Sequence, residues 1–431
     1  MSSEIQSSIK AAASTLATGL ISNYNGYLPG NTPGLLSSPY YWWEAGVMFD
    51  TLIQYFHLTG DSQYNGMVSE ALQFQQGPNA DFMPSNQTKT EGNDDQGIWA
   101  LAAMSAAEAQ LPGPPGKTWV ALAEAVFNEQ VARWDYGTCG GGLRWQIYTF
   151  NTGYTYKNSI SSGLFFQLAS RLARYTGNST YSDWATTSFN WTTSSGLIDT
   201  EWNVFDGADV STNCSAINHL QWSYVAGTFI TGAAHMYNIT TGSTQATWKS
   251  SLDGLLNTTL SVFFPSGIAT EILCESIAAC TVDEKGLKGM LGRWLADTIQ
   301  MAPYTSSLIA PKLQSSAQAA AKACTGTGDG CSFVWSGSNS ATGNATGGVG
   351  EQLDALSYVQ GLLVGSASVP ITSSTASGSN SSSSSTTTSG TASSSTVPVH
   401  SAAAAINMDS ESLGVGLFAG FLLVEMAWLL L

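Results

Sequence analysis

The sequence is short of charge. Only 10% of its 431 residues are Asp, Glu, Lys or Arg, against roughly 25% in an average soluble protein. Its 30 acidic residues outnumber the 14 Lys and Arg residues, the formal net charge is -16, and the basic residues form no cluster. Because binding to a nucleic-acid backbone requires a basic surface, we exclude nucleic acid as a partner.

Metal and nucleotide signatures are also missing. The four histidines have no ligand spacing, the six cysteines form no CxxC pair, and no Gly-rich phosphate loop is present, so we expect no metal and no cofactor. An even number of cysteines without such spacing indicates disulfides and an oxidising compartment. The sequence does not give the pairing, although two local pairs, 274 with 280 and 324 with 331, are close enough to form. The disulfide candidates are Cys139, Cys214, Cys274, Cys280, Cys324 and Cys331.

Aromatic residues and glycan acceptors are abundant, by contrast. The chain has 14 Trp and 16 Tyr, and 43% of its residues are hydrophobic, which is enough for a large core. The density of Asn-X-Ser/Thr sequons indicates a secretory route and supplies solubility that charge does not. These sequons begin at Asn86, Asn178, Asn190, Asn213, Asn238, Asn257, Asn344 and Asn380.

The two ends of the chain have distinct compositions. Residues 366–400 are mostly Ser, Thr, Gly and Ala, which cannot bury a core, so we expect a disordered, O-glycosylated stalk. Residues 401–431 match a GPI-attachment signal, with cleavage between Ser401 and Ala405, and Glu425 argues against the alternative of a membrane-spanning helix. The N-terminus shows no signal peptide, and we expect that the original start was trimmed.

Residues 1–365 are expected to form one all-α catalytic domain. Turns such as "FHLTGDSQYNGMV" recur at intervals of roughly 55 to 65 residues without strand-like runs between them, which indicates stacked helical hairpins. Helices apolar on most faces belong inside and one-sided helices outside, so we predict an (α/α)6 barrel in which the N-terminal helix packs on the last inner helix. The inner helices are expected near Tyr40, Asn93, Asn158, Ala216, Gly286 and Gly348, and the outer helices near residues 2–23, 62–76, 118–134, 180–193, 245–264 and 306–324.

The long connections are all expected at the N-terminal ends of the inner helices, where a site on a rigid scaffold belongs. The second inner helix begins there with adjacent carboxyls, Asp94 and Asp95, in "GNDDQGIWALAAMSAAE". Neighbouring residues can meet the roughly 5 to 5.5 Å separation of a retaining glycosidase pair. The alternative is an ordinary helix start with an N-cap and first-turn acids. The long connections are residues 24–39, 77–92, 135–157, 194–215, 265–285 and 325–347.

Aromatic and polar residues in neighbouring loops favour a sugar site. Aromatic faces suit the C–H faces of pyranose rings, although each aromatic alone is more often core. Asp206 and Asp209 either bind hydroxyls or form an Asx-type turn. The candidate substrate-binding residues are Trp42, Trp43, Asn93, Gln96, Trp145, Lys157, Asn158, Asp206, Asp209 and Trp222.

Several motifs together resemble fungal, GPI-anchored members of glycoside hydrolase family 76, the α-1,6-mannanases. They are "YYWWEAG", "GNDDQGIWALAAMSAAE", "CGGGLRWQI", "YKNSISSGLFFQLASRLARYTGN", "YSDWA", "FDGAD" and "KGMLGRWL". The resemblance implies a retaining mechanism with Asp94 as nucleophile and Asp95 as acid/base, acting on α-1,6-mannan or GPI-glycan mannose. It also implies a monomer anchored to the membrane or cell wall, and transfer of the glycan to wall glucan as acceptor. The alternative function is a non-catalytic, mannan-binding wall glycoprotein.

Overall fold

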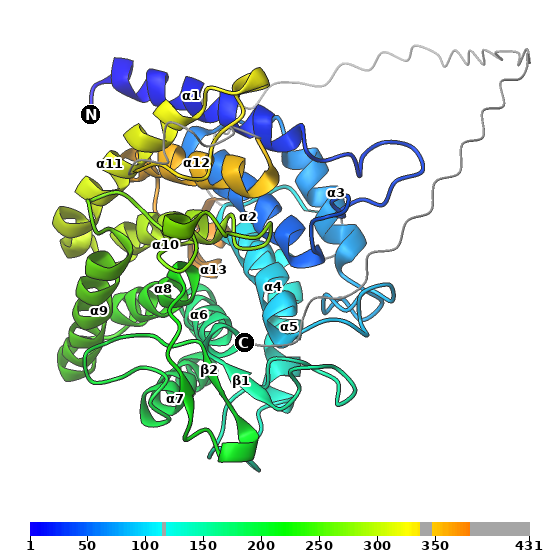
Figure 1. Ribbon diagram of the computed structural model, residues 1–431, viewed down its shortest axis with the longest axis vertical. Helices are drawn as coiled ribbons and strands as arrows, with labels where there is room; N and C mark the ends of the chain where they lie inside the picture. Colours follow the sequence, from blue (N-terminus) through cyan, green and yellow to red (C-terminus); the bar gives the residue numbers. More distant parts are fainter. Residues whose placement is uncertain (114–117, 337–346, 380–431) are drawn as a thin grey trace, which may run out of the picture. The chain divides into compact units, whose positions relative to one another are not determined.

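Two concentric rings of helices make up the domain in the computed structural model, which describes residues 1–113, 118–336 and 347–379 (Figure 1). Each inner helix contacts the next one, and the last contacts the first, so the ring is closed. The inner helices are α2 (Trp42–Thr59), α4 (Asn93–Glu108), α6 (Ser159–Thr176), α8 (Ser223–Ile239), α10 (Leu287–Met301) and α12 (Val349–Gly361). The outer helices are α1 (Ser3–Ile21), α3 (Asn65–Gln75), α5 (Trp119–Ala132), α7 (Ser179–Ser194), α9 (Gly242–Phe263) and α11 (Ser306–Ala323).

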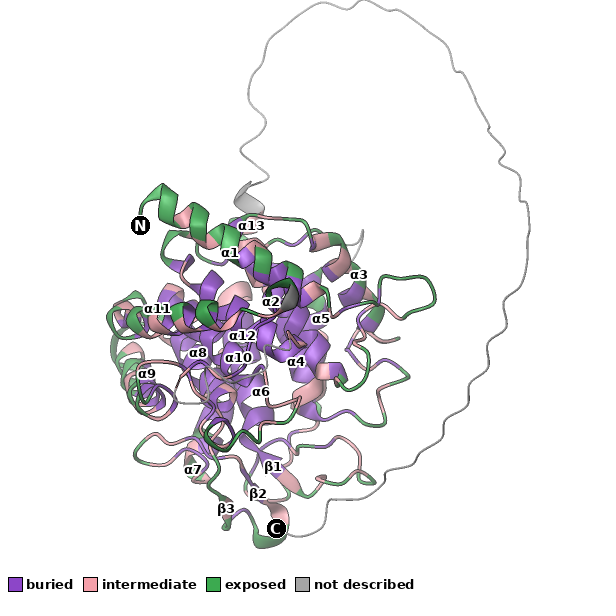
Figure 2. Cartoon of the chain, turned by 45° about the horizontal axis from the view of Figure 1, so that its top comes forward, coloured by how far each residue is buried: buried purple, intermediate pink, exposed green. Residues whose placement is uncertain are grey.

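This arrangement confirms the predicted (α/α)6 barrel, including the contact of the N-terminal helix α1 with α12. Figure 2 shows the inner helices buried on nearly every face, whereas the outer helices are exposed on one side. Helix α6, for example, is buried without interruption from Ser159 to Ala173, while α9 buries only a stripe that includes Trp248 and Leu252. Helix α6 includes buried polar residues such as Ser161, Gln167 and Arg171, so its burial follows from its place in the inner ring and not from apolar residues alone.

Local signals set the ends of the inner helices. The Asn158 side chain accepts a hydrogen bond from the Ser161 N–H and so caps the start of α6. Gly177 ends the same helix in the left-handed conformation that glycine adopts most easily. Within the ring, Gly163 lets α6 approach α8 closely, because a Cβ there would lie 2.1 Å from Thr228 Oγ1.

The structure differs from the sequence-based prediction in two places: it contains a small sheet, and the fourth inner helix begins later than expected. Strand β1 (Tyr156–Asn158) pairs antiparallel with β2 (Gly207–Asp209), and β2 pairs with β3 (Ile217–Asn218). Strands of two or three residues carry no periodicity, and their pairing joins distant loops, so they could not be predicted from the sequence. The inner helix expected near Ala216 begins at Ser223, because β3 and its flanking loop occupy the preceding residues.

The six cysteines form three disulfides. Cys139–Cys214 joins two long loops, whereas Cys274–Cys280 and Cys324–Cys331 close the two local loops that the spacing suggested. The asparagines of the six described sequons are all exposed. Asn344 and Asn380 lie outside the described residues.

The described chain continues past the predicted boundary at residue 365. Helix α13 (Ser373–Ser379) follows a segment that contacts the barrel, in which the Ile371 N–H donates to Glu108 O. The first part of the expected stalk is therefore ordered. The remainder, residues 380–400, and the expected GPI signal, residues 401–431, lie outside the described residues. Among the described helices, none has the length and apolar character needed to cross a membrane.

Candidate active site

A cavity of about 420 Å³ opens where the N-terminal ends of the inner helices converge. Its walls come from the starts of α2, α4, α6 and α8 and from two of the long loops, which places a site at the end of the barrel where the sequence predicted one. The lining residues are Tyr41, Trp43, Asp94, Asp95, Ile98, Trp145, Gln146, Ile160, Tyr224 and Asp283.

Asp94 and Asp95 close around Gly92 at the start of α4. The Gly92 N–H donates to Asp95 Oδ2 at 2.6 Å, and the Asp95 N–H donates to Asp94 Oδ1 at 3.1 Å. A Cβ at Gly92 would lie 2.2 Å from Asp94 Oδ1 and 3.2 Å from Asp95 Oδ2. These two oxygens cannot be farther apart than the sum of those distances, which is below the roughly 6.5 Å minimum of an inverting pair. The geometry therefore fits a retaining pair.

Burial and mutual repulsion set the proton state of the pair. Burial, and then the charge of Asp95, raise the pKa of Asp94 well above its ordinary value. Burial also raises the pKa of Asp95, to about 6, although the hydrogen bond from Gly92 opposes the shift. The pair therefore gives up its protons less readily than two isolated aspartates, and the raised pKa values belong to the pair rather than to either carboxyl alone.

Asn93 and Gln96 flank the pair, but they are buried and face away from the cavity. Arg133 donates to both side chains, to Asn93 Oδ1 at 3.0 Å and to Gln96 Oε1 at 2.6 Å. The Asn93 amide also bonds Arg144 O, and the Gln96 amide bonds Asp81 O. These bonds hold the first turn of α4 in place, and neither residue lines the cavity, so the structure gives no support to their predicted role as direct sugar ligands.

Glu91 is a further carboxyl that sequence analysis missed. Its side chain is 2% exposed, and no described residue hydrogen-bonds either of its oxygens. Burial, reinforced by the charge of Asp95 and opposed by Arg133, raises the pKa of Glu91 to about 9. A neutral, protonated Glu91 therefore lies next to the catalytic turn at neutral pH.

Of the predicted aromatic residues, Trp43 and Trp145 line the cavity. A Cβ at Gly153 would lie 2.4 Å from the Trp145 ring, so the glycine backbone covers one side of this half-exposed ring. Trp42 does not belong to the site: it is buried, stacks on Trp99 with ring centroids 5.2 Å apart, and donates to Gln75. Adjacent residues on a helix point in different directions, so only one tryptophan of this pair reaches the cavity.

Asn158 and Lys157 hydrogen-bond groups near the cavity but do not line it. Asn158 Nδ2 lies 3.4 Å from Asp94 Oδ2, a long hydrogen bond that helps to orient the carboxyl. Lys157 is fully buried, and its ammonium group bonds the carbonyls of Asp135, Thr138 and Gly141. Lys157 therefore fixes a loop and does not line the cavity, which leaves its predicted contact with substrate without support.

Asp206, Asp209 and Trp222 lie around the small sheet, outside the lining of the cavity. Asp206 accepts hydrogen bonds from the Tyr156 hydroxyl at 2.6 Å, from Asn218 and from Trp222. Asp209 accepts from the Ser211 N–H and the Thr155 hydroxyl, which is the Asx-type turn that the sequence left open. Their polar groups serve the loops, so direct sugar binding by these three residues is not supported.

Three lining residues had a local signal that sequence analysis did not use. Ile98 lies four residues after Asp94 and therefore on the same face of α4. Ile160 follows the capping Asn158, and Gln146 follows Trp145. Asp283 had no such signal, because only the folded chain brings its loop to the cavity.

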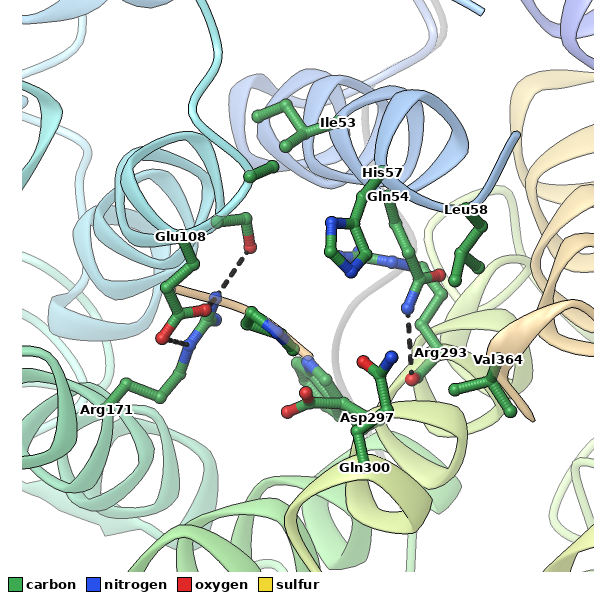
Figure 3. Close-up of a pocket in the computed structure, with 14 residues that line it drawn as sticks. Ile53, Gln54, His57, Leu58, Glu108, Arg171, Arg293, Asp297, Gln300 and Val364 are labelled. Carbon is green, nitrogen blue, oxygen red and sulfur yellow. Dashed lines mark hydrogen bonds and ion pairs between the residues drawn. The ribbon is translucent and has the colours of Figure 1, made fainter. Parts of the chain in front are cut away.

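A second cavity lies at the opposite ends of the inner helices, and Figure 3 shows its lining. It measures about 50 Å³, room for only a few water molecules. Glu108 pairs with Arg171 at 2.7 Å, and the Gln54 amide donates to Arg293 O (Figure 3). This second cavity is smaller than the one at Asp94 and Asp95, and the charges of Glu108 and Arg171 in its lining are paired with each other.

No convincing metal site is present among the described residues. The one group with suitable spacing is Cys274, Cys280 and Glu284. The two cysteines form a disulfide, which leaves a single carboxylate as a ligand.

Comparison with known proteins agrees with this geometry. The model of glycosyl hydrolase family 76 matches residues 8–374. Mannan endo-1,6-alpha-mannosidase DFG5 of Saccharomyces cerevisiae is 41% identical over 372 residues, which cover 85% of this chain and 80% of that protein. Dfg5 from Chaetomium thermophilum, solved in complex with glucosamine, is 44% identical with a TM-score of 0.81, over 85% of this chain and 93% of that chain.

A more distant structure shares the fold. It is an inactive variant of the GH76A alpha-1,6-mannanase of Salegentibacter sp. HEL1_6 in complex with alpha-1,6-mannotriose, with a TM-score of 0.65 at 16% identity, over 83% of this chain and 99% of that chain. The family match and the fungal relatives cover most of the chain at high identity. The chain therefore belongs to glycosyl hydrolase family 76.

Proposed function

We propose that this protein is a retaining endo-α-1,6-mannosidase that acts on α-1,6-linked mannose. The observation that carries the proposal is the close approach of Asp94 and Asp95 around Gly92 in an aromatic-lined cavity. The S. cerevisiae relative is a mannan endo-1,6-alpha-mannosidase, which supports α-1,6-linked mannose as the substrate. The inactive Salegentibacter variant, in which two consecutive aspartates are replaced, supports the role of an adjacent pair.

The chemistry proceeds in two steps. Asp94 attacks the anomeric carbon while Asp95 donates its proton to the leaving oxygen, which breaks the glycosidic bond and leaves a mannosyl ester on Asp94. Asp95, now a carboxylate, removes a proton from the incoming hydroxyl as that oxygen attacks the same carbon and releases Asp94. The two inversions give net retention.

These roles require an ionised Asp94 and a protonated Asp95 when substrate is bound. Burial and the charge of Asp95 raise the pKa of Asp94, which opposes its ionisation in the free protein. A substrate favours the required state when it places the positive charge of the developing oxocarbenium ion at Asp94 and its leaving oxygen at Asp95.

We further propose that the second step transfers the glycan to a cell-wall glucan, and that the substrate includes the mannose of GPI glycans. Among the described residues, those that line the cavity include three acidic residues, Asp94, Asp95 and Asp283, and no Lys or Arg. Such a cavity suits a glycan that carries an ammonium group, and the Chaetomium relative was solved with glucosamine. Three disulfides support a secreted protein, which we place at the membrane or wall through a GPI anchor, as a monomer.

The alternative is a mannan-binding protein without catalytic activity. It leaves the open pair unexplained, because carboxyls that merely start a helix do not need to share a cavity with aromatic rings. The charge at this helix start is also costly, since burial raises the pKa of both acids.

Two variants test the proposal and its roles. Asp94→Asn should abolish cleavage both of α-1,6-mannan and of a mannoside with a dinitrophenyl leaving group. Asp95→Asn should abolish cleavage of mannan but retain the dinitrophenyl substrate, because that leaving group needs no proton. The opposite pattern would exchange the two roles, and full mannan cleavage by both variants would refute the enzymatic proposal.

A further inference from the structure

The loop that supplies Trp145 and Gln146 to the cavity also carries an aromatic pair that the proposed chemistry does not use. Tyr148 and Phe150 stack face to face, with centroids 5.2 Å apart and planes 9° apart. Tyr148 is half-buried, whereas 68% of Phe150 is exposed. One face of Phe150 is therefore covered by a ring and the other is open to solvent.

The loop that holds this pair is fixed rather than loosely placed. The Asn151 N–H donates to Tyr148 O and closes a turn, while the Asn151 side chain donates to Gln146 Oε1 and Lys89 O, each at 3.0 Å. At the other end of the loop, Arg144 lies 4.5 Å from the centroid of the Tyr154 ring and donates to Tyr154 O. An exposed aromatic ring on such a loop costs no ordering entropy when a ligand binds.

The aromatic pair lies on the same loop as two residues that line the cavity. Gln146, the partner of Asn151, lines the cavity together with Trp145. Trp145 and Phe150 lie on the same loop and have similar surroundings. Gly153 covers one side of the Trp145 ring, Tyr148 covers one side of the Phe150 ring, and both rings are exposed on the other side. A flat ring of this kind suits the apolar face of a pyranose.

We propose that Phe150, backed by Tyr148, is a distal subsite for a further mannose ring of the substrate chain, beyond the sugars held in the cavity at Trp145. The inference rests on the proposed function. It explains a preference for internal bonds of a long chain, because the added contact is available only to substrates that extend out of the cavity.

The test measures kcat/KM on α-1,6-linked mannooligosaccharides from the disaccharide to the hexasaccharide. For the wild-type protein, kcat/KM should increase with length until the distal subsite is filled. Phe150→Ala should lower kcat/KM on the hexasaccharide by about threefold to tenfold, the range expected for loss of one stacking contact. It should leave the shortest cleaved substrate unchanged, and Phe150→Trp should restore the preference for length.

Phe74→Ala is the matched control, because Phe74 is also an exposed phenylalanine, at 56%, but lies on the outer helix α3. It should leave the length dependence unchanged. Equal loss on short and long substrates in Phe150→Ala, or no loss on any, would overturn the distal subsite while the proposed function stands. If the wild-type protein cleaves none of these substrates, and its Asp94→Asn variant binds none of them in calorimetry, both proposals fail.

Discussion

The Gly92 N–H holds Asp95 Oδ2 at 2.6 Å, and the missing side chain of the same glycine leaves room for Asp94 Oδ1. One residue thus orients one carboxyl and accommodates the other. The backbone of Gly92 is extended, with φ of -91°, so any residue could adopt it. Glycine is needed here for space rather than for an unusual conformation.

Gly92→Ala should therefore reduce catalysis without unfolding the protein. The added Cβ would lie 2.2 Å from Asp94 Oδ1 and 3.0 Å from Trp145 O, so the carboxyl must move. Misplacement of about 1 Å costs on the order of 100-fold in rate, which we expect in kcat on α-1,6-mannan. Gly66→Ala is the control, because a Cβ at this position in α3 meets nothing within 4 Å. Wild-type kcat in Gly92→Ala would show that the close approach is unimportant.

The pH profile of kcat/KM should have an acid limb near the pKa of Asp95. Below about pH 6, Asp95 gains a proton and the pair becomes doubly protonated, so no carboxylate is left to act as nucleophile. Activity should therefore rise through pH 6 and fall again only at higher pH, where the raised pKa of Asp94 is passed and the remaining proton is lost. A profile flat from pH 4 to pH 8 would contradict this assignment.

Buried acids should make the protein more stable in mild acid than at alkaline pH. Burial raises the pKa of Glu91 from 4.5 to about 9, and those of Glu271 and Asp354 to about 8. Between the ordinary and the raised pKa the folded state binds more protons than the unfolded state, so the free energy of unfolding falls as pH rises. Denaturant unfolding at pH 5 and pH 8 measures this difference, and greater stability at pH 8 would contradict it.

Glu91→Gln should remove part of that pH dependence. Glutamine has nearly the same shape as glutamate but no charge. Folding of the variant therefore carries no free-energy cost for protonating Glu91 or for burying its carboxylate. We expect the free energy of unfolding to rise by at least about 1 kcal/mol at pH 8, since one pKa unit corresponds to about 1.4 kcal/mol. The gain should shrink toward pH 5. Glu70→Gln, at an exposed position of α3, should change stability by no more than about 0.5 kcal/mol at either pH.

Arg133→Met should lower kcat through the neighbours of the catalytic pair. The guanidinium bonds both Asn93 and Gln96, which flank Asp94 and Asp95. Without it the first turn of α4 loses two side-chain contacts, and we expect kcat to fall by at least about tenfold with little change in KM. Arg133→Lys keeps the positive charge but lacks the guanidinium group that bonds two side chains at once. Its kcat should therefore lie between those of Arg133→Met and the wild-type protein. A rise in KM with unchanged kcat in both variants would assign Arg133 to substrate binding instead.

The disulfides should differ in their contributions to stability. Cys139–Cys214 closes a loop with a sequence separation of 75, whereas the separation of Cys274–Cys280 is 6. Since a longer loop loses more entropy on cross-linking, replacing the first pair by serines should cost roughly 2 to 4 kcal/mol and the second pair less. Thermal unfolding of the two double variants compares them. A larger loss for the shorter loop would show that local strain, not chain entropy, dominates.

Much of the barrel could be predicted because its signals are local. Turns such as that around Gly177 predicted the helix ends and the two rings. The adjacent carboxyls of Asp94 and Asp95 were recognisable for the same reason, because they are neighbours at a helix start. Directions of individual side chains were not predictable: Trp42, Asn93, Gln96 and Lys157 lie at the expected end of the barrel, but their side chains are buried against other parts of the protein.

Contacts between distant segments were the part that sequence could not supply. The strand pairing of Tyr156 with Asp209, which shortens the fourth inner helix, depends on two loops meeting in space. Asp283 reaches the cavity, and Arg133 reaches Asn93, only through the closed ring. Glu91 was missed because its burial, not its position in a motif, makes it unusual.

The segment after α12 ties the chain to the barrel at the end away from the carboxyl pair. Gln300 donates to Ser368 O, and Arg174 donates to the carbonyls of Pro370 and Ile371. If the polypeptide that follows is tethered, a mechanical load on it enters the molecule at these bonds, near the C-terminal ends of the inner helices. These bonds would break before the load reached the turn around Gly92. A pulling force on the C-terminal segment would therefore leave the carboxyl pair in place.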